Sequence, residues 1–152
     1  MSQLATNKKA SFDYQVLEKY EAGLVLFGYE AKAVRDGQVS LRGSFISVRR
    51  LNGRPELYLI GCRISPYKHA GAMPDYNPTR DRKLLLNRKE IHYLLGKRQV
   101  EGLTLIPLKI YTNHSFLKLE FAVAKGKKKF DKREAIKKRE VERNLRSLIK
   151  RR

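Results

Sequence analysis

Positive charge is concentrated at the C-terminal end of this chain. Residues 125–152 contain 14 Lys and Arg against four Asp and Glu, a net charge of +10 out of +19 for the 152 residues. The few large apolar side chains in this segment cannot offset the entropy lost when it is ordered. We therefore predict a folded domain over 1–124, which supplies the hydrophobic core, and a basic tail over 125–152 that is disordered when free.

The same tail can become a helix when it binds a partner. It contains no proline and only one glycine, and the pairs Glu134/Lys138 and Glu142/Arg146 have the i, i+4 spacing and order that stabilise helices. Two interpretations stay open at this point. The tail is either a solvated basic extension that raises nonspecific RNA affinity or a segment that folds in a phosphate-lined channel.

The charge balance of the whole chain indicates a polyanionic partner. A net charge of +19 repels itself unless nucleic acid, or alternatively an anionic membrane surface, neutralises it. No run of about 18 apolar residues is present, and residues 1–10 lack the pattern of a secretory signal. We therefore expect a cytoplasmic protein that binds nucleic acid and not membranes.

The first 124 residues are patterned as β-structure with few helices. Two signals predict strands: alternation of apolar with polar residues, and runs of β-branched and aromatic residues. The predicted strands are 13–17, 21–27, 44–49, 56–64, 104–111 and 116–124. Asn52-Gly53 predicts a tight hairpin turn, and Pro107 an edge or a bulge. In the last strand Lys118 alternates with apolar neighbours, so its side chain should point outward.

Two short helices and one long loop complete this domain. Asn87 and Glu90 have capping-box spacing before an apolar i, i+3, i+4 pattern, and Gly96 should stop that helix. A second helix is expected over 29–35, and residues 71–82, with two prolines and no periodicity, should form a surface loop. The predicted fold class is mainly β with short helices, a small antiparallel barrel of the oligonucleotide-binding type.

No catalytic or metal-binding motif is found. Cys62 is the only cysteine, so neither a disulfide within the chain nor a thiolate-rich metal site can form. His69, His92 and His114 lack metal-ligand spacing, and no nucleophile elbow or phosphate-binding loop is present. We expect no enzyme, no metal and no cofactor; an RNA-processing enzyme that uses His92 or His114 is the alternative.

Several short blocks then resemble the SsrA-binding protein family, also called small protein B, along nearly the whole chain. The blocks are Asn7-Lys8-Lys9-Ala10, Tyr20-Glu21-Ala22-Gly23-Leu24, Gly28-Tyr29-Glu30-Ala31-Lys32-Ala33-Val34-Arg35, Asn77-Pro78-Thr79-Arg80-Asp81-Arg82-Lys83-Leu84-Leu85-Leu86, Ala124-Lys125-Gly126-Lys127-Lys128 and Asp131-Lys132-Arg133. Arg-x-Arg-Lys-Leu-Leu-Leu and the lysine-rich block about 40 residues later are the most specific pair. Within the third block, Tyr29, Ala31, Ala33 and Val34 depart from the family pattern, which affects the expected packing of that helix.

This resemblance implies a function in ribosome rescue. Members of the family bind the tRNA-like domain of transfer-messenger RNA (tmRNA) and deliver it to stalled ribosomes for trans-translation, in which the tail lies in the vacant messenger channel near small-subunit ribosomal RNA. One monomer per tmRNA is the simplest expectation. A general RNA-chaperone or ribosomal protein with a basic tail is the alternative.

The resemblance and the charge pattern together give two sets of candidate residues. The RNA-binding set on the barrel is Asn7, Lys8, Glu21, Arg80, Arg82, Lys83, Leu85 and Lys118. The ribosome-engaging set in the tail is Lys125, Lys127, Lys128, Asp131, Lys132, Arg133, Lys137 and Lys138. Glu21 would accept bonds from RNA donors or orient a neighbouring cation. Leu85 would contact an unpaired base, or else be a core residue of its leucine run.

Overall fold

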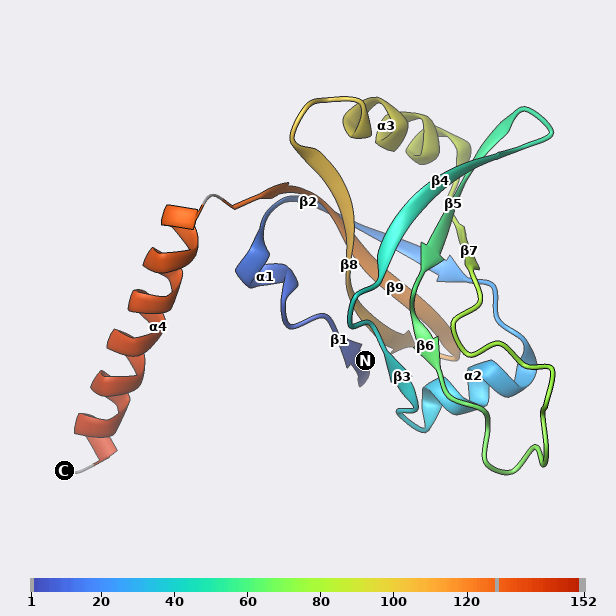
Figure 1. Ribbon diagram of the computed structural model, residues 1–152, viewed down its shortest axis with the longest axis horizontal. Helices are drawn as coiled ribbons and strands as arrows, with labels where there is room; N and C mark the ends of the chain where they lie inside the picture. The colour runs from blue at the N-terminus through green and yellow to red at the C-terminus, as the bar shows by residue number, and fades with distance from the viewer. Residues whose placement is uncertain (1, 128, 151–152) are drawn as a thin grey trace.

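An antiparallel sheet of seven strands dominates the computed structural model, which describes residues 2–127 and 129–150 (Figure 1). The strand order is β1-β8-β9-β2-β7-β5-β4, and β3 and β6 form a separate pair. The elements are β1 (Ser2–Thr6), α1 (Ala10–Asp13), β2 (Tyr14–Leu24), α2 (Gly28–Arg35), β3 (Val39–Ser40), β4 (Phe45–Leu51), β5 (Arg54–Ile60), β6 (Arg63–Ile64), β7 (Arg82–Leu85), α3 (Arg88–Arg98), β8 (Leu103–Asn113), β9 (Phe116–Gly126) and α4 (Lys129–Lys150).

The sheet curls into a barrel around an apolar core. The last strand in the order, β4, comes within 8 Å of β8 between Cα atoms, although β8 is second from the other end. Leu59, Leu84, Ile110 and Phe121 fill the interior from four different strands and are almost completely buried. The predicted mainly β barrel with short helices is thereby confirmed.

Local sequence signals identified several elements correctly. Asn52 and Gly53 have φ angles of 51° and 77°, as a two-residue hairpin turn between β4 and β5 requires. The register of β8 against β9 shifts between Pro107 and Lys109, which confirms a bulge at the proline. The Asn87 side chain accepts a hydrogen bond from the Glu90 backbone N–H at 2.9 Å and caps α3.

Other predicted boundaries were wrong. β2 is one strand with a bulge between Val16 and Glu18, not two strands. The predicted strand over 56–64 is divided at Gly61, whose φ of 77° turns the chain between β5 and β6. α3 continues through Gly96 to Arg98, because the roughly 1 kcal/mol cost of a helical glycine is small beside the burial of Leu94. β1, α1, β3 and β7 were not predicted.

Lys129–Lys150 form the helix α4, which projects from the barrel in Figure 1. The prediction of a helical tail fits this helix, whereas disorder of the free tail stays a prediction. Exposed apolar side chains on α4 include Ile136, Val141 and Leu145. Among the described helices, none combines the length and the apolar character that crossing a bilayer requires.

A buried carboxylate joins α2 to the long connection between β6 and β7. Glu30 is 0% exposed, and its Oε1 accepts hydrogen bonds from the Phe27 backbone N–H at 2.9 Å and from Arg80 Nη2 at 2.5 Å. Its Oε2 accepts from Arg82 Nε at 3.0 Å, from Arg82 Nη2 at 2.6 Å and from the Tyr76 hydroxyl at 3.1 Å. We call Glu30, Tyr76, Arg80 and Arg82 the Glu30 cluster.

Arg82 is the fully buried arginine of the Glu30 cluster. Its guanidinium is 0% exposed and donates further hydrogen bonds to the carbonyl oxygens of Cys62 at 2.5 Å and Pro78 at 3.0 Å. Each donation satisfies a backbone oxygen of a segment that has little regular structure. Arg82 therefore holds the turn between β5 and β6 at Cys62 and the connection between β6 and β7 at Pro78, and it begins β7 itself.

Replacement of Arg82 should destabilise the protein strongly. In the Arg82→Met variant the Glu30 carboxylate stays buried with fewer donors, so we expect a loss of about 3 to 5 kcal/mol in the free energy of unfolding. Urea unfolding followed by circular dichroism measures this loss. Arg63→Met is the matched control, because Arg63 is exposed on β6 and its replacement should change stability by less than about 0.5 kcal/mol. Equal effects of the two substitutions would contradict the proposed importance of the cluster.

Acid should weaken the same cluster. Burial raises the pKa of Glu30, but hydrogen bonds from Arg80, the Phe27 N–H and Arg82 outweigh it and hold the pKa below its usual value of 4.5. The folded state thus binds this proton less readily than the unfolded chain, so the stabilisation is complete above pH 4.5 and is lost as pH falls through the lowered pKa. Urea midpoints at a series of acidic pH values should fall more steeply for the wild type than for Glu30→Gln; parallel curves would disprove this.

Candidate nucleic-acid interface

Three predicted RNA-binding residues lie together on the outer face of the sheet. Gly23 of β2 is in register with Leu85 of β7 on one side and with Lys118 of β9 on the other. Glu21 is two residues earlier on β2, so its side chain is on the same face. The lack of a side chain on Gly23 lets Leu85 lean over β2, since a Cβ there would lie 3.3 Å from the Leu85 Cβ.

Glu21 is positioned by two partners. The Tyr111 hydroxyl donates a hydrogen bond to its Oε2, and the Lys118 Nζ is 3.9 Å from its Oε1. Burial and the hydrogen bond to Glu21 both raise the pKa of Tyr111, which therefore remains a protonated donor. With its carboxylate held in this way, Glu21 orients the Lys118 ammonium, one of the two roles considered for it from the sequence.

A hollow of about 410 Å³ opens beside these residues. Its walls include Leu85, which is 54% exposed, and Phe116, which is 66% exposed at the start of β9. The Lys118 Nζ is 5.8 Å from the centre of the Phe116 ring, and Arg35 also lines the hollow. The exposure of Leu85 excludes a core position, because a core leucine would be buried as Leu84 is. Its contact with an unpaired base stays a prediction.

Phe116 was missed as a site residue although a signal was present. The alternation of β9 places Phe116, Lys118 and Glu120 on the face opposite Leu119 and Phe121. An aromatic residue at an outward position beside a lysine is the composition on which unpaired bases stack. We call Glu21, Leu85, Phe116 and Lys118 the outer sheet site.

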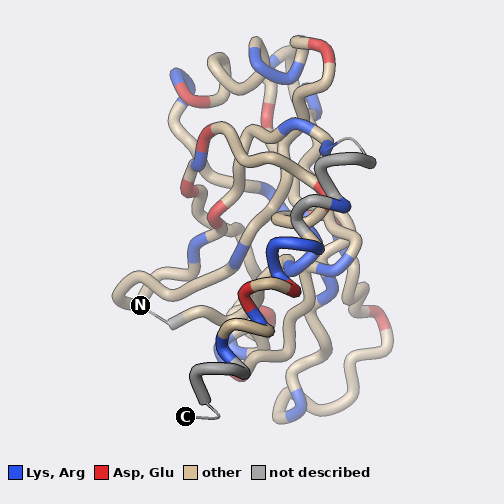
Figure 2. Tube along the Cα trace, turned by 90° about the vertical axis from the view of Figure 1, so that its left-hand side faces the viewer, with Lys and Arg blue, Asp and Glu red and all other residues tan. Residues whose placement is uncertain are grey.

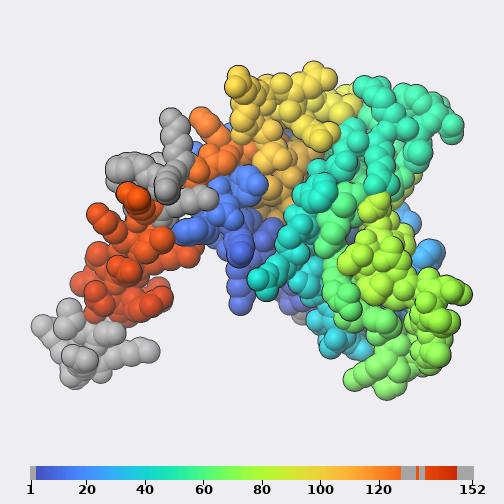
Figure 3. Space-filling view, in the orientation of Figure 1, coloured from blue at the N-terminus to red at the C-terminus, as the bar shows by residue number. Residues whose placement is uncertain are grey.

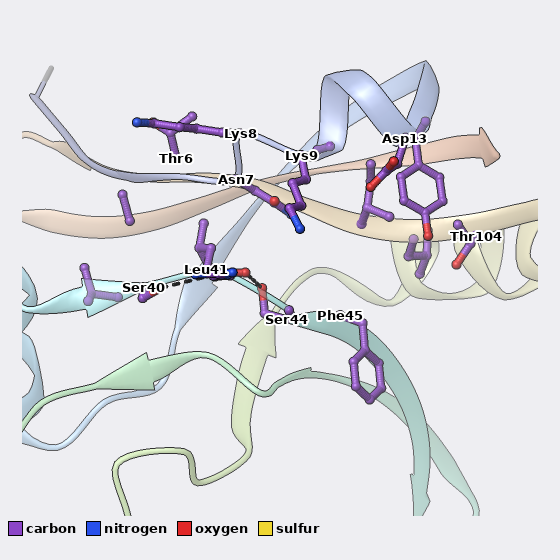
Figure 4. A pocket seen from close by; sticks show the side chains of 18 residues that line it. Thr6, Asn7, Lys8, Lys9, Asp13, Ser40, Leu41, Ser44, Phe45 and Thr104 are labelled. Atoms are coloured by element: carbon purple, nitrogen blue, oxygen red, sulfur yellow. Dashed lines mark hydrogen bonds between the residues drawn. The ribbon is translucent and has the colours of Figure 1, made fainter. Parts of the chain in front are cut away.

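Asn7 and Lys8 lie at a different place, between the end of β1 and the segment from β3 to the start of β4. Figure 4 shows the segment Thr6–Lys9 on one side of a cavity of about 610 Å³ and Ser40, Leu41, Ser44 and Phe45 on the other. The Asn7 side chain donates to the Pro107 carbonyl at 2.9 Å and its backbone N–H to the Leu108 carbonyl at 2.7 Å. Asn7 therefore fastens β1 to the β8 bulge, whereas Lys8 is exposed.

The predicted cations near β7 have three different environments. The assignment of Arg82 to RNA binding was wrong, because its side chain is 0% exposed within the Glu30 cluster. Arg80 is 25% exposed and lies 4.2 Å from the centre of the Phe27 ring. Lys83 points outward, 40% exposed, and is 3.0 Å from the Glu56 carboxylate.

The tail residues are divided between the barrel and α4. Lys125, assigned to the tail, is in β9, where it pairs with Gln15 and Leu103, because the strand continues to Gly126. The Lys127 Nζ donates to the Ser11 carbonyl at 2.7 Å. Lys128 and the side chains of Asp131 and Lys132 lie outside the described residues. Arg133, Lys137 and Lys138 are exposed on α4, and Figure 2 shows basic residues along this helix.

Described residues near the start of α4 contact α1 and the residues next to it. The Lys127 backbone N–H donates to the Asp13 carbonyl at 2.9 Å, and the Arg139 guanidinium is 6.0 Å from the Phe12 ring centre.

In the described part of the chain, no three His, Cys, Asp or Glu side chains gather as a possible metal site. Binding through exposed bases and phosphates is the chemistry that the described surface supports best.

Comparison with known proteins finds relatives over almost the full length of this chain. The family model described as SmpB protein matches residues 4–151. The SsrA-binding protein of Thermosipho melanesiensis is 49% identical over 151 residues, covering 99% of both chains. That of Rubrobacter xylanophilus is 49% identical over 152 residues, covering 100% of this chain and 98% of the relative.

A solved structure is similar in fold as well as in sequence. It is described as "tmRNA-SmpB: a journey to the center of the bacterial ribosome" and matches with a TM-score of 0.64 and 43% identity. The match covers 86% of this chain and 92% of the other. By its sequence over almost the full length and by its fold, this chain belongs to the SmpB family of SsrA-binding proteins.

Proposed function

We propose that this protein binds the tRNA-like domain of tmRNA through the outer sheet site and delivers it to stalled ribosomes for trans-translation. The observation that carries the proposal is the exposed pair Leu85 and Phe116 beside the ordered Lys118 and Glu21. Apolar and aromatic surfaces stack on unpaired bases, and a neighbouring ammonium attracts phosphate. The SsrA-binding relatives and the tmRNA-SmpB structure support the choice of tmRNA as the ligand.

The protein would act by placement and not by catalysis. In the described surface, the outer sheet site offers bases a stacking face and an ammonium, and no pair of groups there is arranged as a general acid and base. The barrel would hold tmRNA while α4, with its exposed Arg133, Lys137 and Lys138, engages ribosomal RNA. One copy per tmRNA, acting in the cytoplasm where ribosomes stall, is sufficient for this role.

A general RNA-binding function is the second candidate, favoured by the charge of +19 alone. Electrostatic attraction to phosphates is independent of sequence and shape, so it would give similar affinities for many RNAs. The outer sheet site argues against this function, because its exposed apolar side chains would select an RNA that displays unpaired bases.

Competition binding at fixed physiological salt distinguishes the two functions. Labelled tmRNA bound to the full chain is displaced with unlabelled tmRNA, with ordinary tRNA and with an unrelated hairpin. We expect a clear preference for tmRNA, which residues 1–126 retain because the outer sheet site is on the barrel. Equal affinities for all three RNAs, lost on removal of the tail, would establish the general binder instead.

Leu85→Ala tests the site itself. Loss of one base contact should lower the affinity for tmRNA about tenfold, at the low end of the 1–3 kcal/mol typical of stacking contacts. Leu17→Ala is the matched control, because Leu17 on β2 is 47% exposed and lies outside the outer sheet site. The proposed site is disproved if both variants bind tmRNA like the wild type, and urea unfolding verifies that neither substitution disrupts the fold.

A further inference from the structure

Leu85 lines two hollows of the surface. The first is the hollow of the outer sheet site, which also contains Phe116 and Lys118. The second, of about 200 Å³, lies between the β4–β5 hairpin and α3 and is lined by Arg54, Glu56, Lys83, Leu85, Arg88 and Ile91, among others. Figure 3 shows α3 and the hairpin directly beside each other. The two hollows therefore meet at one exposed leucine.

The second hollow carries two arginines that are free to bind a ligand. Its one acidic residue, Glu56, is 3.0 Å from the Lys83 ammonium, so these two charges neutralise each other. Arg54, at the start of β5, and Arg88, at the start of α3, are both exposed. Neither has an acidic partner within the described part of the chain. The remaining charge of the hollow is positive.

Guanidinium groups at this position suit a phosphate backbone. Arginine presents a planar fork of N–H donors that binds phosphate oxygens in pairs, and it is less strongly hydrated than lysine. A base is joined through its sugar to a phosphate on either side, so a strand whose base packs on Leu85 brings phosphates next to the hollows that Leu85 lines. Leu85 also lines the second hollow, so those phosphates would lie beside the guanidinium groups of Arg54 and Arg88.

We propose that the second hollow is a phosphate-binding site that continues the outer sheet site, with Arg54 and Arg88 as its RNA-binding residues. Its ligand is the sugar-phosphate backbone of the RNA strand that places a base on Leu85. The inference rests on the proposed function, because it needs RNA at Leu85. Since contacts to phosphate fix register without reading sequence, this site holds the RNA in place while the outer sheet site contacts its bases.

The chain contains a matched control for this site on the same two elements. Arg50 on the β4–β5 hairpin and Arg98 on α3 are also exposed. They line a third hollow with Val48, Leu95 and Gln99, and this hollow shares no residue with the outer sheet site. Replacing either pair of arginines removes the same charge from the same hairpin and the same helix.

The experiment compares the double variants Arg54→Gln/Arg88→Gln and Arg50→Gln/Arg98→Gln in the full chain. We expect the first to bind tmRNA about tenfold more weakly at physiological salt, with the slope of log affinity against log salt reduced in magnitude by about two. The second should stay within about twofold of the wild type, since Arg50 and Arg98 line a hollow that shares no residue with the outer sheet site. Urea unfolding establishes that both variants are folded.

Equal losses in the two variants would overturn the inference, because only the overall charge would then matter. The inference is also overturned if Arg54→Gln/Arg88→Gln binds tmRNA as tightly as the wild type does. In that case the proposed function still stands, provided that the wild-type protein prefers tmRNA over tRNA. If the wild type shows no such preference, the proposed function itself fails, and the inference fails with it.

Discussion

The buried ion pair between Glu30 and Arg82 sets the register of β7, and the surface of the barrel depends on that register. Successive side chains of a strand point to opposite faces, so an inward Arg82 brings Leu84 inward and turns Lys83 and Leu85 outward. A slip of one residue would bury Leu85 and expose the arginine. The ion pair therefore determines which residues of this strand a ligand can contact, although it contacts no ligand itself.

The central strand β2 then brings distant segments to one place. Gly23 has Leu85 of β7 and Lys118 of β9 as its two neighbours, so residues that lie 62 and 95 positions after it in the sequence meet on one face. Glu21 lies 3.9 Å from the Lys118 ammonium on this face, which gives an acidic residue a role in the proposed RNA site without contact to phosphate. Most of the barrel's acidic residues are paired with cations in this way. Positive charge remains on exposed arginines and lysines of the barrel, Lys8 among them, and on the tail.

Local patterns in the sequence were sufficient for β9, the β4–β5 hairpin, the cap of α3 and the helical character of the tail. The missed features depend on distant partners. β7 has four residues and begins with an arginine, so it resembled the end of a loop; its burial depends on Glu30, 52 residues earlier in the chain. Arg82 was assigned to RNA binding because its burial against the distant Glu30 is not visible in the sequence. Glu21, Leu85 and Lys118 were proposed from the family resemblance, and the strand register explains why they meet. The alternation of β9 already indicated that Phe116 faces outward, but its place in the same hollow as Leu85 follows only from the three-dimensional arrangement.

The central claim is that the barrel holds tmRNA and the tail acts on the ribosome, and reconstituted trans-translation tests it most directly. Tagging of a stalled nascent chain is measured with the full chain, with residues 1–126 and with Leu85→Ala, each over a range of protein concentrations. The claim predicts that residues 1–126 bind tmRNA but give no tagging at any concentration, whereas Leu85→Ala regains tagging as its concentration rises. Full tagging by residues 1–126, or a defect in Leu85→Ala that added protein does not overcome, would contradict this division of labour.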